Sequence, residues 1–352
     1  MKHRRSSRET WVDAVKVLAC ILVVLGHFFQ SMTKANIIEQ TVLYTWFNRT
    51  IYYFHVPLFF LCSGYLYQRG KPEKGNYDHY QLVLKKLLGL GVPFVVFSLA
   101  NWLLKAMFAS AVNTQANSLV TDLFIRPAAP YWYLYTLFFI FLITPAINSK
   151  ISACVIAGLA IAAQGVSLFF KNFGIYALDT MLANWLWFVL GMILCFTDSP
   201  KLLRKQKGAK EMGLAIFVLF FAGSIAVVMR QVSHSLLSFL FGLIACSGIV
   251  VMAVNIKFSE NAKKIIRWLS DYTLPIYLMH TIFAAAFRSL LLKLGITNAA
   301  VHIVAGLVIS FGGPILVGFV FKKLKWPEFI LYPGKFIKIK SKKEVSSHGE
   351  KA

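Results

Sequence analysis

A lysine and a histidine lie within the first apolar segment of the chain, WVDAVKVLACILVVLGHFFQ, residues 11–30. Ionisable side chains inside a membrane segment are costly and by default indicate a functional site. On a helix, Lys16 and His27 project from nearly the same face, about 16 Å apart along the axis. A neutral imidazole can accept a proton near neutral pH. The pair therefore predicts a cation and a general base on one stripe; the alternative is a pore-lining or satisfied histidine with a snorkelling lysine.

The second apolar segment, IYYFHVPLFFLCSGYLY over residues 51–67, carries a second histidine. His55 lies about four residues from the outer end of its predicted helix, as does His27, so both are expected about 6 Å below the outer interface. The alternative for His55 is an interfacial histidine beside Pro57. Ser63 and Gly64 are interpreted as a small step where another helix approaches, because no strand-turn-helix elbow surrounds a nucleophilic serine there.

Other segments add a basic pair, an aromatic residue and a third histidine. Lys85 and Lys86 begin the third span, where they act as inside anchors or bind a phosphorylated ligand. Trp132 begins the fourth span, where it fits an aromatic belt or a platform for a sugar ring. His280 lies near the middle of the ninth span. Polar residues also fall in the outer halves of other spans: Asn101, Gln164 and Asn184. This convergence predicts an internal cavity.

Composition predicts the fold class. The chain is 58% hydrophobic and 14% charged, with a mean hydropathy of +0.64, which is typical of a multi-spanning membrane protein. We expect an all-α polytopic fold with about ten transmembrane helices. The predicted spans are 14–31, 51–67, 83–104, 131–148, 151–170, 179–197, 213–230, 236–254, 272–292 and 299–321.

The positive charge predicts orientation rather than nucleic-acid binding. If the N-terminus is cytoplasmic, 28 of the 37 lysines and arginines fall on the cytoplasmic side, and the C-terminus is cytoplasmic too. The domain prediction is a basic cytoplasmic tail (1–13), a transmembrane domain (14–321) and a basic cytoplasmic tail (322–352) that lies along the inner leaflet.

The five cysteines all lie in apolar segments, without metal-ligand or disulfide spacing, and are interpreted as small core residues. We expect no metal site. The sequence also lacks a glycine-rich phosphate loop and the motifs of soluble hydrolases.

In order and spacing, these motifs resemble the membrane-integral acyltransferase-3 family, which contains bacterial O-acetyltransferases of polysaccharides and lipopolysaccharide. The matching pieces run from D-x-x-K-x₁₀-H (Asp13, Lys16, His27) through FHVPLFFLCSGYLY, KKLLGLGVPF and the WYL element at Trp132 to LPIYLMH at His280. The first motif is similar to the fucose-4-O-acetylase branch. The family more often has arginine at the Lys16 position and an arginine-rich pattern at Lys85 and Lys86; lysine keeps the charge but loses the bidentate fork.

The resemblance implies an O-acyltransferase that moves an acyl group, most often acetyl, from cytoplasmic acetyl-CoA to a hydroxyl of a cell-surface or lipid-linked glycan. It implies that His27 is the essential general base and Lys16 its charged companion. Lys85 and Lys86 are predicted to bind the donor acyl-CoA. The acceptor or cavity residues are predicted to be His55, Ser63, Trp132 and His280.

The resemblance further implies a multi-pass protein of the bacterial cytoplasmic membrane, in exopolysaccharide or lipopolysaccharide biosynthesis. We expect no bound cofactor, acetyl-CoA or another acyl-CoA as co-substrate, and a glycan acceptor, the lipid bilayer and polysaccharide-synthesis machinery as partners. Two other classes stay open from the residues alone. A polytopic glycan transporter would also have buried charges and a proline-broken helix, although no internal repeat is evident. An accessory subunit of a polysaccharide synthase would not need His27.

Overall fold

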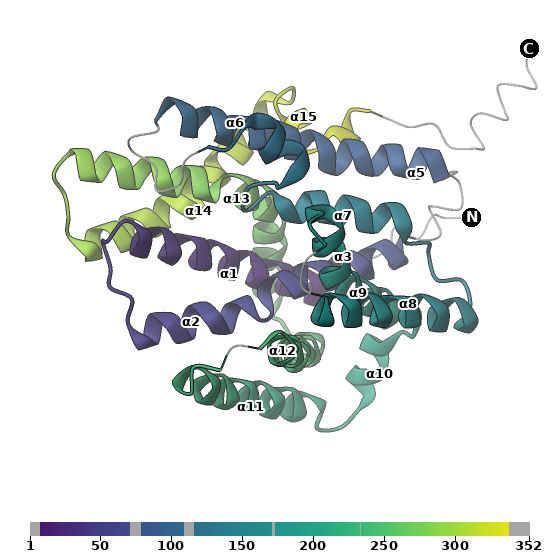
Figure 1. The fold of residues 1–352 in the computed structure, drawn as a ribbon. Helices are drawn as coiled ribbons and strands as arrows, with labels where there is room; N and C mark the ends of the chain where they lie inside the picture. The colour runs from purple at the N-terminus through teal and green to yellow at the C-terminus, as the bar shows by residue number, and fades with distance from the viewer. Residues whose placement is uncertain (1–7, 71–78, 109–115, 171–172, 233, 338–352) are drawn as a thin grey trace, which may run out of the picture.

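The computed structural model describes residues 8–70, 79–108, 116–170, 173–232 and 234–337. These residues form helices and contain no strand, so the predicted all-α class is confirmed (Figure 1). In this described part, eight helical segments are long and apolar enough to cross a membrane. They are α1 (Thr10–Lys34), the run Val83–Met107, α8 (Lys150–Phe169), α9 (Tyr176–Phe196), α11 (Ala209–Met229), α12 (Ser235–Asn255), α13 (Glu260–Lys293) and α14 (Ala299–Leu324).

The predicted spans 51–67 and 131–148 form shorter helices than expected. α3 (His55–Arg69) has 15 residues and α7 (Trp132–Ile143) has 12, which correspond to about 22 Å and 18 Å of helix, less than the hydrocarbon core of about 30 Å. Both helices are buried along much of their length among longer helices. A helix surrounded by protein does not need to match the thickness of the lipid. The other eight predicted spans coincide with the eight long segments, and the count of ten remains a prediction.

Shorter elements connect and flank these helices. They are α2 (Val42–Tyr52), α5 (His79–Lys86), η1 (Leu87–Gly91), α6 (Val92–Met107), η3 (Thr121–Ile125), α10 (Ser199–Lys205), α15 (Glu328–Leu331) and η4 (Pro333–Lys335). In Figure 1, α5 and α6 lie along one edge of the bundle and α11 and α12 along the opposite edge.

The run Val83–Met107 contains a π-helical turn, η1, between α5 and α6. Pro93 has no N–H to donate to the Gly89 carbonyl four residues earlier, and the glycines Gly89 and Gly91 tolerate the wider turn. Pro93 and the two glycines therefore account for the wider turn at this point.

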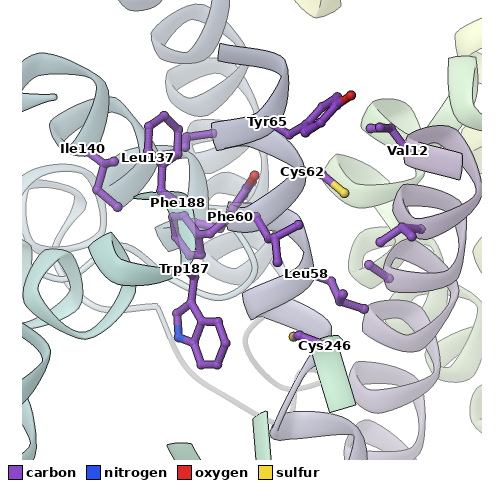
Figure 2. Close-up of a cluster of buried hydrophobic side chains, with 14 of the residues drawn as sticks. Val12, Leu58, Phe60, Cys62, Tyr65, Leu137, Ile140, Trp187, Phe188 and Cys246 are labelled. Atoms are coloured by element: carbon purple, nitrogen blue, oxygen red, sulfur yellow. The ribbon is translucent and has the colours of Figure 1, made fainter. Parts of the chain in front are cut away.

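The core is centred on α3, which packs between α1 and α9 (Figure 2). Aromatic and aliphatic side chains fill this region, including the fully buried Phe60, Phe188 and Leu58. The backbones of α3 and α9 touch at two glycines. A Cβ at Gly64 would overlap the carbonyl oxygen of Phe188, and one at Gly191 would overlap that of Leu61. The predicted close-packing step beside Ser63 is therefore confirmed.

Apolar side chains also cover the outside of the bundle. Leu159 of α8, Leu219 of α11 and Val308 of α14 are each more than half exposed. Rows of exposed apolar residues on long helices are expected where the solvent is lipid. The structure therefore has the apolar exterior of a multi-pass membrane protein.

Two details correct the expectations from the sequence. Cys20, Cys62 and Cys246 are buried, but Cys154 is exposed on α8, a helix with several exposed apolar side chains, so it is not a core residue. Helix α13 begins at Glu260, twelve residues before the predicted span, because Ser259 caps the Ala262 N–H.

The start of the C-terminal tail packs on the protein. Leu331 is buried, and the Tyr332 hydroxyl donates to the Asp271 carbonyl at 2.9 Å. This contact fixes the end of α15 against α13. Beyond residue 337, the prediction that the tail lies along the inner leaflet falls outside the described residues.

Candidate active site

His27 lies at the junction of two cavities. The first, called the histidine cavity, has a volume of about 270 Å³ and is lined by His27, His55, Trp132, Tyr133 and Asn184 together with apolar residues of α1, α3 and α13. The helical phase of α1 turns His27 toward α3 and α13, while its neighbours Gly26 and Phe28 pack in the interior. The structure thus brings His27 and His55, from two helices, to one cavity.

His280 lies against His27 on the side of α13. The two ring centroids are 5.4 Å apart, with an interplanar angle of 42°. The Nδ1 of His280 lies 2.9 Å from the carbonyl oxygens of Ile276 and Tyr277, so it carries the hydrogen and donates. The Nε2 of His280 is then an acceptor. It is buried and has no hydrogen-bond partner among the described residues. The local helix therefore fixes the tautomer of His280.

His55 is fixed in the same way. Its Nδ1 donates to the Ile51 carbonyl at 2.6 Å, which leaves Nε2 as the acceptor nitrogen. The ring also packs edge-on against Tyr52, with centroids 4.6 Å apart. Two histidines with acceptor nitrogens therefore lie near His27: His280 packs against its ring, and His55 lines the same cavity.

The second cavity, called the wide cavity, has a volume of about 510 Å³. It shares His27 and Trp132 with the histidine cavity. Its other polar and aromatic residues are Gln30, Ser31, Lys34, Lys105, Asn117, Arg126, Tyr176 and Thr281. The indole of Trp132 and the ring of Tyr176 give it two aromatic walls, and Arg126 lies 5.9 Å from the centre of the Tyr176 ring. Aromatic faces beside hydrogen-bonding groups fit a polar ring such as a sugar.

A third cavity continues from the wide cavity and is called the α6–α13 groove. It has a volume of about 370 Å³ and shares Ser31, Lys105, Ala129 and Thr281 with the wide cavity. Its walls are mostly apolar, with Leu104 and Phe108 from the α6 side and Leu290 from α13. Arg288 and Lys293 also line it.

Lys16 lies at the other end of α1, in a polar network with α13. Its Nζ donates to the Ser270 hydroxyl at 3.3 Å, and that hydroxyl donates to the buried Asp13 carboxylate at 2.7 Å. Arg8 closes the network with an ion pair of 2.5 Å to Asp13. Asp13, three residues before Lys16, therefore links Lys16 to Arg8 through Ser270.

Lys16 also lines a cavity of about 370 Å³, called the lysine cavity, between α1, α13, α14 and the start of the C-terminal tail. Its charged lining residues are Arg8, Lys16, Asp271, Lys322, Glu328 and Lys335. The two acids are paired within the protein, Asp271 with Arg8 at 2.7 Å and Glu328 with Lys335 at 2.6 Å. The lysine cavity therefore has an excess of positive charge and is separate from the cavities at His27.

Lys85, Lys86 and Ser63 lie apart from these cavities. The Nζ of Lys86 is 3.8 Å from the centre of the Phe141 ring, so the ammonium is held by a cation–π contact between α5 and α7. Neither lysine lines the lysine cavity. The Ser63 hydroxyl shares a hydrogen bond of 2.9 Å with the Tyr133 hydroxyl, behind the wall of the histidine cavity.

The sequence analysis did not assign the cations around the wide cavity and the groove to a site, and it counted Arg288 only among the charges of the outer side. Arg288 lies inside α13 and is 3% exposed. Its position within the predicted span 272–292 was a usable signal, because a charged residue inside a span is rare. The side-chain contact to Ser31, 257 residues away, could not be seen in the sequence.

The fold and the site define a class: a helical, multi-pass membrane protein with a histidine between internal cavities. The comparison with known families gives the more particular result. Residues 9–319 match the acyltransferase-3 family, described as an acyltransferase domain. The match covers nearly the whole chain, so the chain belongs to this family of acyltransferase domains.

One curated relative is the nodulation protein NolL of Mesorhizobium japonicum. It is 26% identical over 162 residues, which cover 45% of this chain and 41% of NolL. The match thus spans about two fifths of that relative's length. No solved structure matches the chain.

Proposed function

We propose that the protein transfers an acetyl group from cytoplasmic acetyl-CoA to a hydroxyl of a glycan in a bacterial cytoplasmic membrane, with His27 as the general base. The observation that carries this proposal is the position of His27 at the junction of two cavities in a chain of the acyltransferase-3 family. A sugar hydroxyl is a poor nucleophile and needs a base within hydrogen-bond reach.

The proposed step is as follows. The acceptor hydroxyl lies in the wide cavity, and its oxygen attacks the thioester carbonyl carbon while His27 removes its proton. The carbon–sulfur bond breaks, and the CoA thiolate leaves and takes the proton from His27. The products are an acetyl ester and CoA, so atoms and charge balance. A base in this position contributes about 10²–10⁴-fold to the rate.

His280 is proposed as a positioning residue. Its fixed Nε2 acceptor can receive a hydrogen from a ring nitrogen of His27, because a centroid separation of 5.4 Å allows two facing nitrogens to approach to about 3 Å. The other nitrogen of His27 then keeps its lone pair toward the substrate. An orienting partner of this kind holds a catalytic histidine in the productive tautomer.

The lysine cavity is proposed to bind the phosphates of the donor. Lys16 and Lys322 line it without an ion pair to any described carboxylate, and lysine binds phosphate as a point charge. The flexible arm of CoA separates its phosphates from the thioester, so the phosphates and the reacting carbonyl need separate subsites. An apolar cavity of about 270 Å³ lies further along α1 and has Thr273 in common with the lysine cavity. Lys85 and Lys86 remain the alternative donor site.

The test is acetylation of surface glycans in cells that produce equal amounts of wild-type protein or the His27→Ala variant. Mass spectrometry should detect acetylated glycan only with the wild type. His302→Ala is the matched control, because His302 is a buried helix histidine that lines none of the cavities described here. Equal acetylation by a well-folded His27→Ala variant would reject the proposed base.

A further inference from the structure

One wall of the lysine cavity comes from a part of the chain that follows the family domain. The family match ends at residue 319, whereas the segment 326–335, called the tail segment, comes after the end of α14. The tail segment supplies Glu328, Tyr332 and Lys335 to the lining of the lysine cavity. The family domain alone therefore does not complete this cavity.

The tail segment is anchored to the protein at both of its short helices. Its helix α15 packs against α6 and α14, and η4 packs against η1 (Figure 1). Leu331 is 1% exposed and belongs to the main hydrophobic core, and the Tyr332 hydroxyl donates to the Asp271 carbonyl of α13. The side chains that the tail segment presents to the cavity therefore have a defined position.

Glu328 and Lys335 form an ion pair in this wall. The Lys335 Nζ lies 2.6 Å from the Glu328 Oε1, and the two side chains are 55% and 12% exposed, respectively. The ammonium also lies 4.6 Å from the centre of the Tyr332 ring. The carboxylate is thus held in the wall, whereas the ammonium is at the end of a flexible four-carbon stem and can turn toward the cavity.

The surrounding charges favour an anion as a new partner for Lys335. Lys16 and Lys322 line the same cavity, and Asp271, the other acid of its lining, is already paired with an arginine. An ion pair with an exposed ammonium contributes little free energy. A phosphate in the cavity would interact with all three lysines at once through charge-assisted contacts. The phosphate is therefore the stronger partner for Lys335, and the Glu328 carboxylate competes with it.

We propose that the tail segment is a donor-binding element, in which Lys335 exchanges Glu328 for a phosphate of acyl-CoA and Glu328 limits the affinity for that phosphate. This inference rests on the proposed function, because it takes the lysine cavity as the donor site. Acetyl-CoA and the product CoA carry the same phosphates. Tighter phosphate binding therefore lowers the Michaelis constant and slows product release without speeding the chemical step. A competing carboxylate keeps the binding of both molecules moderate.

Binding measured in the absence of transfer tests the exchange. The probes are CoA and pantetheine, which has the thiol arm of CoA and lacks its phosphates. Each probe is titrated by calorimetry onto the purified full-length protein in neutral detergent at low salt. Glu328→Gln should tighten CoA binding about threefold, and Lys335→Gln should weaken it about tenfold. Both changes should shrink at high salt, and pantetheine should bind equally to all variants.

A second ion pair provides the matched control. Glu260 and Lys263 are 2.7 Å apart at the start of α13 and do not line the lysine cavity. Glu260→Gln and Lys263→Gln should leave CoA binding unchanged, and thermal unfolding checks that all four variants are folded. A tail segment with a purely structural role would not give changes of opposite sign at Glu328 and Lys335. Weaker or unchanged CoA binding by a folded Glu328→Gln variant would overturn the inference.

The inference and the proposed function can fail separately. CoA binding that is lost in Lys86→Gln and unchanged in Lys335→Gln would overturn the inference and leave transfer through His27 in place. Opposite changes at Glu328 and Lys335, in a wild-type protein that transfers no acetyl group, would support the inference and reject the proposed reaction.

Discussion

Replacing His280 with phenylalanine tests how His27 is oriented. The phenyl ring keeps the volume of a side chain that is 1% exposed, and it removes the Nε2 acceptor of a ring that packs against His27. The Ile276 carbonyl keeps its helical partner, the N–H of residue 280, so the backbone has no reason to change. The variant therefore removes the proposed hydrogen bond while leaving the packing nearly intact.

The size of the effect follows from the lost hydrogen bond. A neutral hydrogen bond contributes about 0.5–1.5 kcal/mol, a factor of about 2–13 in rate if it acts in the transition state. Loss of the fixed tautomer adds to this factor, so we expect kcat to fall about tenfold or more. The Michaelis constant for acetyl-CoA should stay within twofold, because the donor phosphates are proposed to bind at the lysine cavity.

The assay is steady-state acetyl transfer by purified protein, with kcat and the Michaelis constant measured separately. His302→Phe is the matched control. His302 is also buried in a long helix, donates to a carbonyl at 2.8 Å, and has an unpartnered ring nitrogen. A similar fall in both variants would point to general destabilisation. A His280→Phe variant that retains at least half of the wild-type kcat, while His27→Ala is inactive, would show that His280 does not orient His27.

Three further predictions concern the donor, the core and the topology. Lys16→Gln should raise the Michaelis constant for acetyl-CoA about tenfold at low salt, and Lys86→Gln should leave this constant unchanged. Initial rates measure both variants, and the reverse result would move the donor site to α5. Gly64→Ala should destabilise the protein by about 1–3 kcal/mol or more, because the new methyl group overlaps a backbone carbonyl, whereas Gly165→Ala, with open space around it, should not; thermal unfolding in detergent measures both. A cysteine placed at Gln206 in a cysteine-free background should resist an impermeant reagent added outside intact cells, and rapid labelling would overturn the cytoplasmic assignment of this loop.

The arrangement at His27 was partly predictable because helical geometry is local. The phase and depth of Lys16 and His27 on α1 follow from 3.6 residues per turn. The helices that carry His27 and His55 follow one another closely in the sequence, with only α2 between them, and the two histidines line one cavity. His280 lies 253 residues further along the chain, so its contact with His27 depends on how α13 packs against α1. No property of residues 271–283 taken alone specifies that neighbour.

Other site residues were harder to assign because a charged side chain has several structural roles. Lys86 looks like a phosphate ligand or an inside anchor in the sequence, and the structure holds it over Phe141. Arg288 resembles a cation at a helix end, and the structure buries it beside Ser31. A lysine or an arginine can serve as a phosphate ligand, as an anchor at a helix end or as a buried structural cation. Burial by other helices decides which of these roles the side chain has.

The sequence by itself determined the membrane class, the all-α fold, eight long helices and the family, because each depends on composition, on local periodicity or on an ordered set of motifs. Only the tertiary structure decided the lengths of α3 and α7, the separation of the lysine cavity from His27, and the burial of Arg288 beside Ser31. These features arise from contacts between residues far apart in the chain. The free energy of a buried charge depends on the side chains and cavities that surround it, and packing alone sets those surroundings.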